Sequence, residues 1–147
     1  MSPVVMHTVA RMMTPVLLLV SLVLGVRGHD IPGGGFVGGL MAATAFALQM
    51  VAFGRPAAIK QLRVHPTRLA AAGLLVALGS GVPAMLEGNA FLSSDWAEFP
   101  LPWSGSLKVG TPQVFDVGVY LAVLGTAMSF ILGMGRGEDT TVPEART

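Results

Sequence analysis

Residues 28–40 read Gly-His-Asp-Ile-Pro-Gly-Gly-Gly-Phe-Val-Gly-Gly-Leu and lie between two long apolar runs. Six of these thirteen residues are glycine, which lets the backbone turn sharply and lets a neighbouring element approach closely. Pro32 ends any helix that arrives from the N-terminal side. The stretch therefore predicts a tight connection between two helices, with His29 and Asp30 as candidate functional side chains.

Composition places the apolar runs in a lipid bilayer. The 147-residue chain is 52% hydrophobic and 12% charged, whereas charged residues make up about a quarter of a typical soluble domain. The lack of cysteine excludes disulfides, thiolate metal ligands and a thiol nucleophile. The net charge of +1 gives no indication of nucleic-acid binding, so we interpret the basic residues as membrane-topology signals.

Four segments are long and apolar enough to cross a membrane, because a spanning helix needs about 20 mostly apolar residues. We expect an all-α membrane protein with one transmembrane domain, residues 1–134, and a polar C-terminal tail, residues 135–147. A signal peptide is the alternative reading of the first segment, but Arg27 and His29 interrupt any cleavage pattern, so we expect it to be retained. The expected helices cover residues 3–26, 35–53, 69–86 and 112–134.

The start of the fourth helix has its own signal. Thr111 followed by Pro112 is typical of a helix start, with a hydroxyl cap and a proline where no backbone donor is needed. Asp116 then lies in the first two turns, where the positive end of the helix dipole favours a carboxylate. Stabilisation of the helix end and a part in ion access are both open for this residue.

The distribution of Lys and Arg predicts that both termini are cytoplasmic. The loop between the second and third segments carries four basic residues and, with the two termini, collects seven of the nine in the chain. Arg27 and Lys108 remain on the opposite side. By the positive-inside rule, the glycine-rich stretch then faces outward.

The long connection 87–110 is expected on the same outward side. Its aromatic residues suggest an interfacial anchor or a partner-binding loop. Pro100 and Pro102 are expected to break regular structure in it.

Small residues recur every four positions on the third and fourth segments. Such faces let helix backbones approach closely in lipid, so they favour packing against other helices. They comprise Gly73, Ala77 and Gly81; Gly125, Ser129 and Gly133; and Gly118, Ala122 and Thr126.

Two chemical interpretations of the glycine-rich stretch compete with a purely structural one. Residues 33–38 match the dinucleotide pattern G-x-G-x-x-G, but no strand precedes them and no ribose-binding acid follows, which argues against nucleotide binding. His29 and Asp30 could relay protons or hold a cation, or they could cap a turn. No ionisable residue lies deep in the second, third or fourth segment, so this chain alone is a poor candidate for the ion-carrying part.

The chain contains two motifs, each at the start of an apolar segment. The first holds His29, Asp30, Pro32, Gly33, Gly34, Gly35, Phe36, Gly38 and Gly39; the second holds Thr111, Pro112, Phe115, Asp116, Gly118 and Tyr120. Together they resemble the MnhB (MrpB) subunit family of the multisubunit Mrp-type Na⁺/H⁺ antiporter. The resemblance implies a four-helix component of a bacterial or archaeal inner-membrane complex. The large antiporter-like A and D subunits would carry the ions, and the small C, E, F and G subunits would complete the assembly.

We therefore expect a non-enzymatic accessory subunit of a proton-driven Na⁺/H⁺ antiporter, without cofactor or bound metal, in a complex that transports Na⁺ and H⁺. The alternatives are a freestanding homo-oligomeric carrier or channel, favoured by the small-residue faces, and the equivalent component of a membrane-bound hydrogenase or respiratory complex.

Overall fold

The computed structural model describes residues 3–27, 33–86, 88, 96–101 and 105–134. Over this part of the chain the helices are α1 (Pro3–Arg27), α2 (Gly34–Phe53), α3 (Arg55–Leu62), α4 (Pro66–Gly79), α5 (Val82–Leu86) and α6 (Thr111–Met134). The strands are β1 (Trp96–Leu101) and β2 (Gly105–Gly110).

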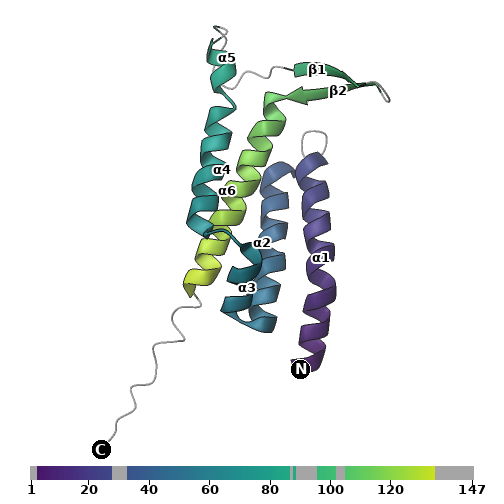
Figure 1. The fold of residues 1–147 in the computed structure, drawn as a ribbon, viewed down its shortest axis with the longest axis vertical. Coiled ribbons are helices and arrows are strands. Elements are labelled where there is room, and N and C mark those ends of the chain that lie inside the picture. Colours follow the sequence, from purple (N-terminus) through teal and green to yellow (C-terminus); the bar gives the residue numbers. More distant parts are fainter. Residues whose placement is uncertain (1–2, 28–32, 87, 89–95, 102–104, 135–147) are drawn as a thin grey trace, which may run out of the picture.

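The long helices stand side by side in a row, in the order α4, α6, α2, α1 (Figure 1). Each neighbouring pair is in extensive contact, and the view down the shortest axis of the molecule shows all of them in one layer. The helix ends form two sides of the layer. One side, at the bottom of Figure 1, contains the N-terminal end of α1, the short α3 and the C-terminal end of α6; the other, at the top, contains α5 and the strands.

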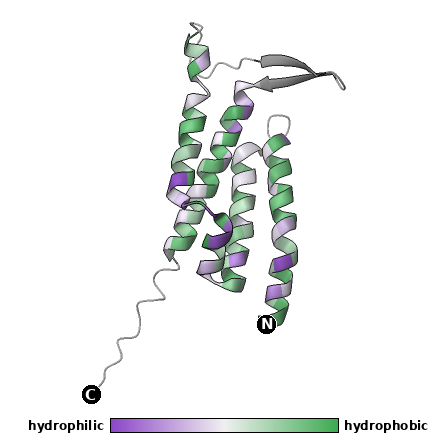
Figure 2. Ribbon diagram, viewed as in Figure 1, coloured by the Kyte–Doolittle hydropathy of each residue, from purple (hydrophilic) through white to green (hydrophobic). Residues whose placement is uncertain are grey.

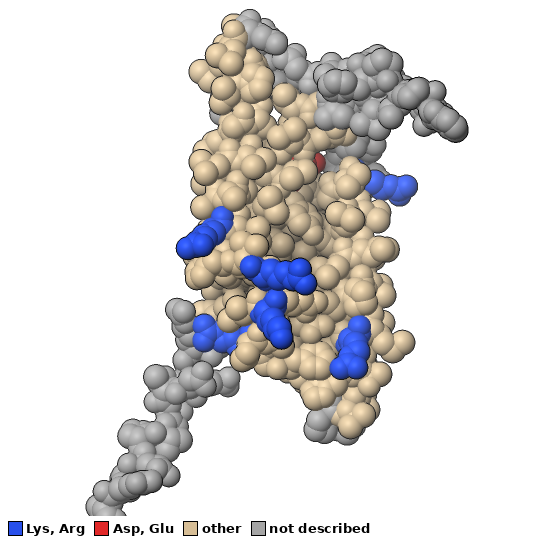
Figure 3. All heavy atoms as spheres, viewed as in Figure 1, with Lys and Arg blue, Asp and Glu red and all other residues tan. Residues whose placement is uncertain are grey.

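The expected all-α architecture of four apolar spans is confirmed. Within the described residues, four helical segments are long and apolar enough to cross a membrane: Val4–Arg27, Gly34–Phe53, Arg55–Leu86 and Thr111–Met134. Figure 2 shows hydrophobic residues along the length of the row and hydrophilic ones concentrated around α3. Of the Lys and Arg side chains that the structure describes, most also lie toward the end that carries α3 (Figure 3).

The third segment differs from the expected continuous helix over residues 69–86. It begins earlier, at Pro66, and is interrupted after Gly79 before α5 starts at Val82. The reason is Pro83, which has no N–H to bond to the Gly79 carbonyl and whose ring collides with that carbonyl in a continuous helix. Ser80 stabilises the break, because its hydroxyl donates to the Ala77 carbonyl oxygen at 2.7 Å.

The connection 87–110 contains regular structure that the sequence did not predict. β1 and β2 pair antiparallel, from Trp96 opposite Gly110 to Leu101 opposite Gly105. The expectation that Pro100 breaks regular structure is wrong, because it lies in β1 opposite Ser106. A two-stranded pair consists of edge strands, which tolerate proline since one side of each makes no ladder bonds. Pro102 and the acidic and aromatic side chains of this connection lie outside the described residues.

Glycines set the distance between α4 and α6. A Cβ on Gly73 would overlap the backbone nitrogen of Ala122 and lie 2.7 Å from the carbonyl oxygen of Gly118. A Cβ on Gly118 would in turn overlap the backbone of Ala77. The predicted face that contains Gly73 therefore packs against the one that contains Gly118. Of the third predicted face, Gly125 also lies against α4, at Ala70, whereas Gly133 has nothing within 4 Å of its Cβ position.

The apolar core lies between α2 and the second half of α6. Two small residues and one large residue of α2 pack against three large side chains of α6, so that the space between the helices is filled. They are Ala42, Ala43 and Phe46 of α2 and Leu124, Met128 and Leu132 of α6.

Replacing Gly73 with alanine is expected to destabilise the protein, because the added methyl group must push α4 away from α6. The expected loss is about 1–3 kcal/mol in the free energy of unfolding, as for other overpacked interiors. Gly79→Ala on the same helix is the matched control, since nothing lies within 4 Å of its Cβ position. Unfolding the detergent-purified variants with SDS measures both, and equal stabilities would contradict the packing described here.

Candidate functional site around Asp116

The glycine-rich start of α2 lies directly against α6. Gly34 is the first residue of α2 and has a positive φ of 50°, a left-handed conformation that other residues adopt at a cost. A Cβ on Gly35 would overlap the Asp116 carbonyl oxygen, and one on Gly39 would lie 2.7 Å from the Tyr120 carbonyl oxygen. The fold thus brings the two sequence motifs together, although α3, α4, α5 and both strands separate them in the chain.

The Asp116 carboxylate lies at the N-terminal end of α2. Its Oδ1 and Oδ2 are 3.0 and 3.2 Å from the position that a Cβ on Gly34 would occupy. The first N–H groups of a helix have no partners within the helix and form the positive end of its dipole. The sequence left two roles open for Asp116, stabilisation of the end of its own helix and ion access. It is the sixth residue of α6, and its carboxylate also lies beside the N-terminal end of α2.

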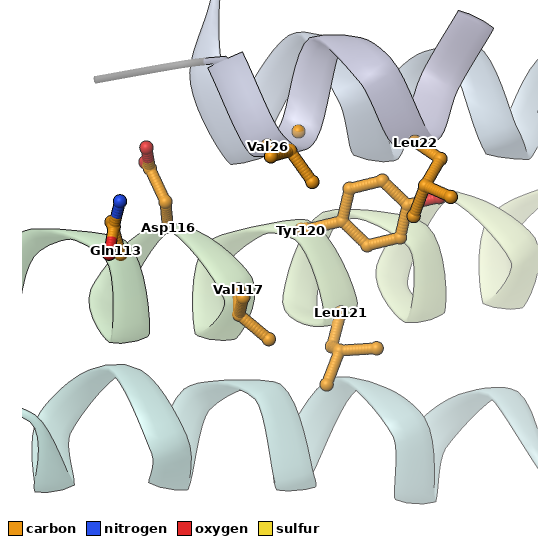
Figure 4. A pocket seen from close by; sticks show the side chains of 8 residues that line it. Leu22, Val26, Gln113, Asp116, Val117, Tyr120 and Leu121 are labelled. Carbon is orange, nitrogen blue, oxygen red and sulfur yellow. The ribbon is translucent and has the colours of Figure 1, made fainter. Parts of the chain in front are cut away.

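A cavity of about 400 Å³ opens beside Asp116 between α1 and α6. In Figure 4 Gln113 and Asp116 lie one turn apart on α6 and point to the same side, while the Tyr120 ring lies further along the helix near Leu22. The cavity is therefore polar at one end and apolar elsewhere. Its lining consists of Leu22, Gly25, Val26, Gln113, Asp116, Val117, Tyr120 and Leu121.

A hydrogen-bonded chain joins three helices at the apolar end of the cavity. The Ser21 hydroxyl donates to the Gly38 carbonyl oxygen at 2.7 Å, and its oxygen lies 2.7 Å from the Tyr120 hydroxyl. Because Ser21 has one proton and gives it to Gly38, Tyr120 is the donor in the second bond. This chain links α1, α2 and α6, and the missing side chain of Gly38 makes room for the Tyr120 ring, which would be 3.0 Å from a Cβ there.

A second polar link joins α1 and α2 nearer to α3, toward the N-terminal end of α1. The Gln49 side-chain amide donates to the Thr14 hydroxyl at 2.9 Å, and that hydroxyl donates to the Ala10 carbonyl oxygen at 2.8 Å. The ring of His7 stacks on that of Phe53, with centroids 4.8 Å apart. These contacts place the side chains of Thr14, Gln49 and His7 between the two spans.

The predicted site residues have different positions in the fold. His29, Asp30 and Pro32 lie outside the described residues, so their part in ion access stays a prediction. Phe36 and Phe115 are exposed on the surface of the row. The remaining motif positions lie in helix starts and contacts: Gly33, the N-cap of α2; Gly34, Gly35, Gly38 and Gly39, against α6 or α1; Thr111 and Pro112, the first residues of α6; and Gly118, against α4.

Sequence reasoning missed Ser21 and Gln113 and gave no role to the Tyr120 hydroxyl. A signal was present, because Tyr120 is the single tyrosine of the chain and lies in an apolar run, where a hydroxyl requires a partner. Within the part of the chain that the structure describes, no group of three or more His, Cys, Asp or Glu side chains could hold a metal ion.

Fold and site together define a small multi-pass membrane protein whose helices are held by glycine contacts and a few polar links. A family model described as a domain related to the MnhB subunit of Na⁺/H⁺ antiporters matches residues 5–129. The chain belongs to this family.

Two relatives and one solved structure illustrate the similarity. The chain is 36% identical over 129 residues to the B subunit of a Na⁺/H⁺ antiporter of Alkalihalophilus pseudofirmus, covering 88% of this chain and 90% of that protein. It is also 36% identical to the A/B subunit of a probable K⁺/H⁺ antiporter of Rhizobium meliloti, covering 93% of this chain but 14% of that longer protein. A chain in the structure of the Mrp complex from Dietzia sp. matches with a TM-score of 0.75 and 33% identity, over 97% of this chain and 15% of that one.

Removing the Tyr120 hydroxyl and the Ser21 hydroxyl tests the polar link among α1, α2 and α6. We expect Tyr120→Phe and Ser21→Ala each to lower the free energy of unfolding by about 0.5–1.5 kcal/mol. The double variant should lose less than the sum, because both changes break the same bond, with a coupling of about 0.6 kcal/mol as is typical between membrane helices. SDS unfolding measures all three variants, and strictly additive losses would contradict the bond.

Proposed function

We propose that this chain is an accessory subunit of a multisubunit, proton-driven Na⁺/H⁺ antiporter in the inner membrane of a bacterial or archaeal cell. The observation that carries the proposal is the match of almost the whole chain to part of a solved Mrp complex, at 33% identity. The function is transport rather than enzymatic catalysis, without a cofactor, and Na⁺ and H⁺ are the transported ions of the complex.

The shape of the row supports a role in an assembly. In the most apolar window of each span, between 17% and 33% of the residues are buried within the chain. Large apolar side chains are exposed on several helices, among them Phe36, Leu75 and Phe130. A row one helix thick offers one face to lipid and the other to partners. The proposed partners are the large antiporter-like A and D subunits and the small C, E, F and G subunits.

Asp116 is the residue of this chain that we propose to act on ions. It is the one acidic residue whose side chain the structure describes, and it lines a cavity whose polar end also contains Gln113. A carboxylate near the end of a span can attract a cation without the cost of a charge at mid-depth. With His29 and Asp30 in the adjoining connection, Asp116 would form an entry region rather than a transport path.

Cation selectivity is proposed to reside in other components of the complex. The chain has the same 36% identity to a relative named for Na⁺ and to one named for K⁺. Similarity in this chain therefore does not separate the two cations.

Complementation of a deletion strain tests the antiporter proposal and the role of Asp116 together. Everted vesicles without this chain should lose Na⁺-dependent dissipation of ΔpH, and the wild-type gene should restore it. Asp116→Asn should assemble normally but raise the Na⁺ concentration for half-maximal exchange by roughly tenfold, because a cation attraction of about 1.4 kcal/mol is lost.

Thr44→Val, at an exposed position of α2, is the control and should behave as wild type. Unchanged exchange after deletion would overturn the antiporter proposal. Wild-type Na⁺ dependence of Asp116→Asn in an intact complex would overturn only the ion-entry role. Ion movement by the purified chain alone in liposomes would favour a freestanding carrier instead.

The proposed orientation places α3 and both termini in the cytoplasm. Since the chain has no cysteine, single cysteines report sidedness without background. Lys60→Cys on α3 should react with a membrane-impermeant maleimide in everted vesicles and not in intact spheroplasts. Leu86→Cys on α5, where the side chain is 83% exposed, should show the opposite pattern. Labelling of Lys60→Cys from outside the cell would reverse the topology.

A further inference from the structure

A second cavity, of about 380 Å³, lies between α3 and the C-terminal end of α6 and is not part of the Asp116 site. Its lining contains both basic and apolar side chains. The basic part is Arg55, Lys60, Arg63 and His65, and apolar residues that complete it include Ile59, Leu62, Val64 and Leu132. Cationic groups beside apolar walls match a ligand that is anionic at one end and hydrocarbon at the other.

The position of the cavity places it at the boundary between hydrocarbon and headgroups. Its α6 residues, from Ser129 to Gly133, belong to the last turns of a 24-residue helix that ends at Met134. At about 1.5 Å per residue such a helix is about 36 Å long, slightly more than the about 30 Å of bilayer hydrocarbon. The last turns of α6 therefore reach the headgroup layer.

Two features of the basic residues indicate an anionic ligand. The Nε–H group of Arg55 is buried and has no hydrogen-bond partner in the described structure, a costly state that a bound oxygen atom would relieve. Arg63, the C-cap residue that follows α3, has a positive φ of 58°. Glycine adopts this conformation at lower cost, yet the position carries a guanidinium beside the cavity.

We propose that this cavity binds the phosphate headgroup of an anionic phospholipid, with the acyl chains on the apolar wall formed by α3 and α6. Arg55 and Arg63 contact the phosphate, and Lys60 adds charge at the rim. Guanidinium groups suit this task because their planar N–H donors match phosphate oxygens. A bound lipid would join the α3 connection to α6, and this role does not depend on antiport.

Lipid binding by the full-length chain in a neutral detergent tests the proposal. Native mass spectrometry should retain phosphatidylglycerol or cardiolipin on the wild-type protein and not phosphatidylcholine, and the anionic lipids should raise the thermal unfolding midpoint. Arg55→Gln combined with Arg63→Gln should weaken anionic-lipid binding by at least roughly tenfold, since each basic residue contributes about 1 kcal/mol at an anionic lipid surface. Arg68→Gln is the matched control, because Arg68 is exposed in the same basic segment but does not line the cavity.

Several results would overturn the proposal. Equal retention of neutral and anionic lipid by the wild-type protein would do so without any variant. An equal loss of binding in Arg68→Gln would reduce the effect to general surface charge. Stabilisation by millimolar inorganic phosphate as large as that by lipid would assign the cavity to a free anion. Loss of lipid retention in the assembled complex would indicate that an acidic segment of a partner covers it.

Discussion

The close approach of helix backbones to α6 is the constraint on which the rest of the structure depends. In a bilayer the hydrophobic effect does not drive helices together, so contact must come from packing and hydrogen bonds at short range. Gly35 and Gly39 of α2 lie against one side of α6, and Gly73 of α4 lies against another. Because α6 stands between them, α2 and α4 are kept apart, and the fold becomes a row rather than a closed bundle.

Polar side chains then fix what the glycines bring close. The backbone of α1 approaches α2 at Gly38. Two hydrogen bonds then link these helices: the Ser21 hydroxyl donates to the Gly38 carbonyl oxygen, and the Gln49 amide donates to the Thr14 hydroxyl. Asp116 instead lies beside the first turn of α2, where helix-end N–H groups compensate a negative charge. In the described part of the spans, the acidic charge of Asp116 thus lies near a helix end and not at mid-depth.

Much of this fold could be predicted from sequence because the bilayer fixes the length of a span and requires apolar side chains along it. Thr111 and Pro112 predicted the start of α6, because a hydroxyl residue followed by proline is typical of the start of a helix. The break before α5 could also have been predicted, since Pro83 cannot continue a helix. The expected helix 69–86 crossed it because hydropathy alone was used to set its bounds. The β1–β2 pair was not predicted, because Pro100 was expected to break regular structure. The position of the Asp116 carboxylate beside the N-terminal end of α2 could not be predicted, because local sequence does not reveal which helices lie side by side.

An unclosed row of helices has two flanks, as an open β-sheet has two edge strands. The two outermost helices, α1 and α4, carry exposed apolar residues, such as Leu19 and Leu75, and neither flank has to be opened before another helix can lie beside it. Growth in the plane of the membrane is therefore possible without repacking the interior. The relative in which a similar stretch makes up 14% of a longer A/B chain is a form that such geometry permits: the same small module can be a separate chain or be extended covalently into a larger neighbour.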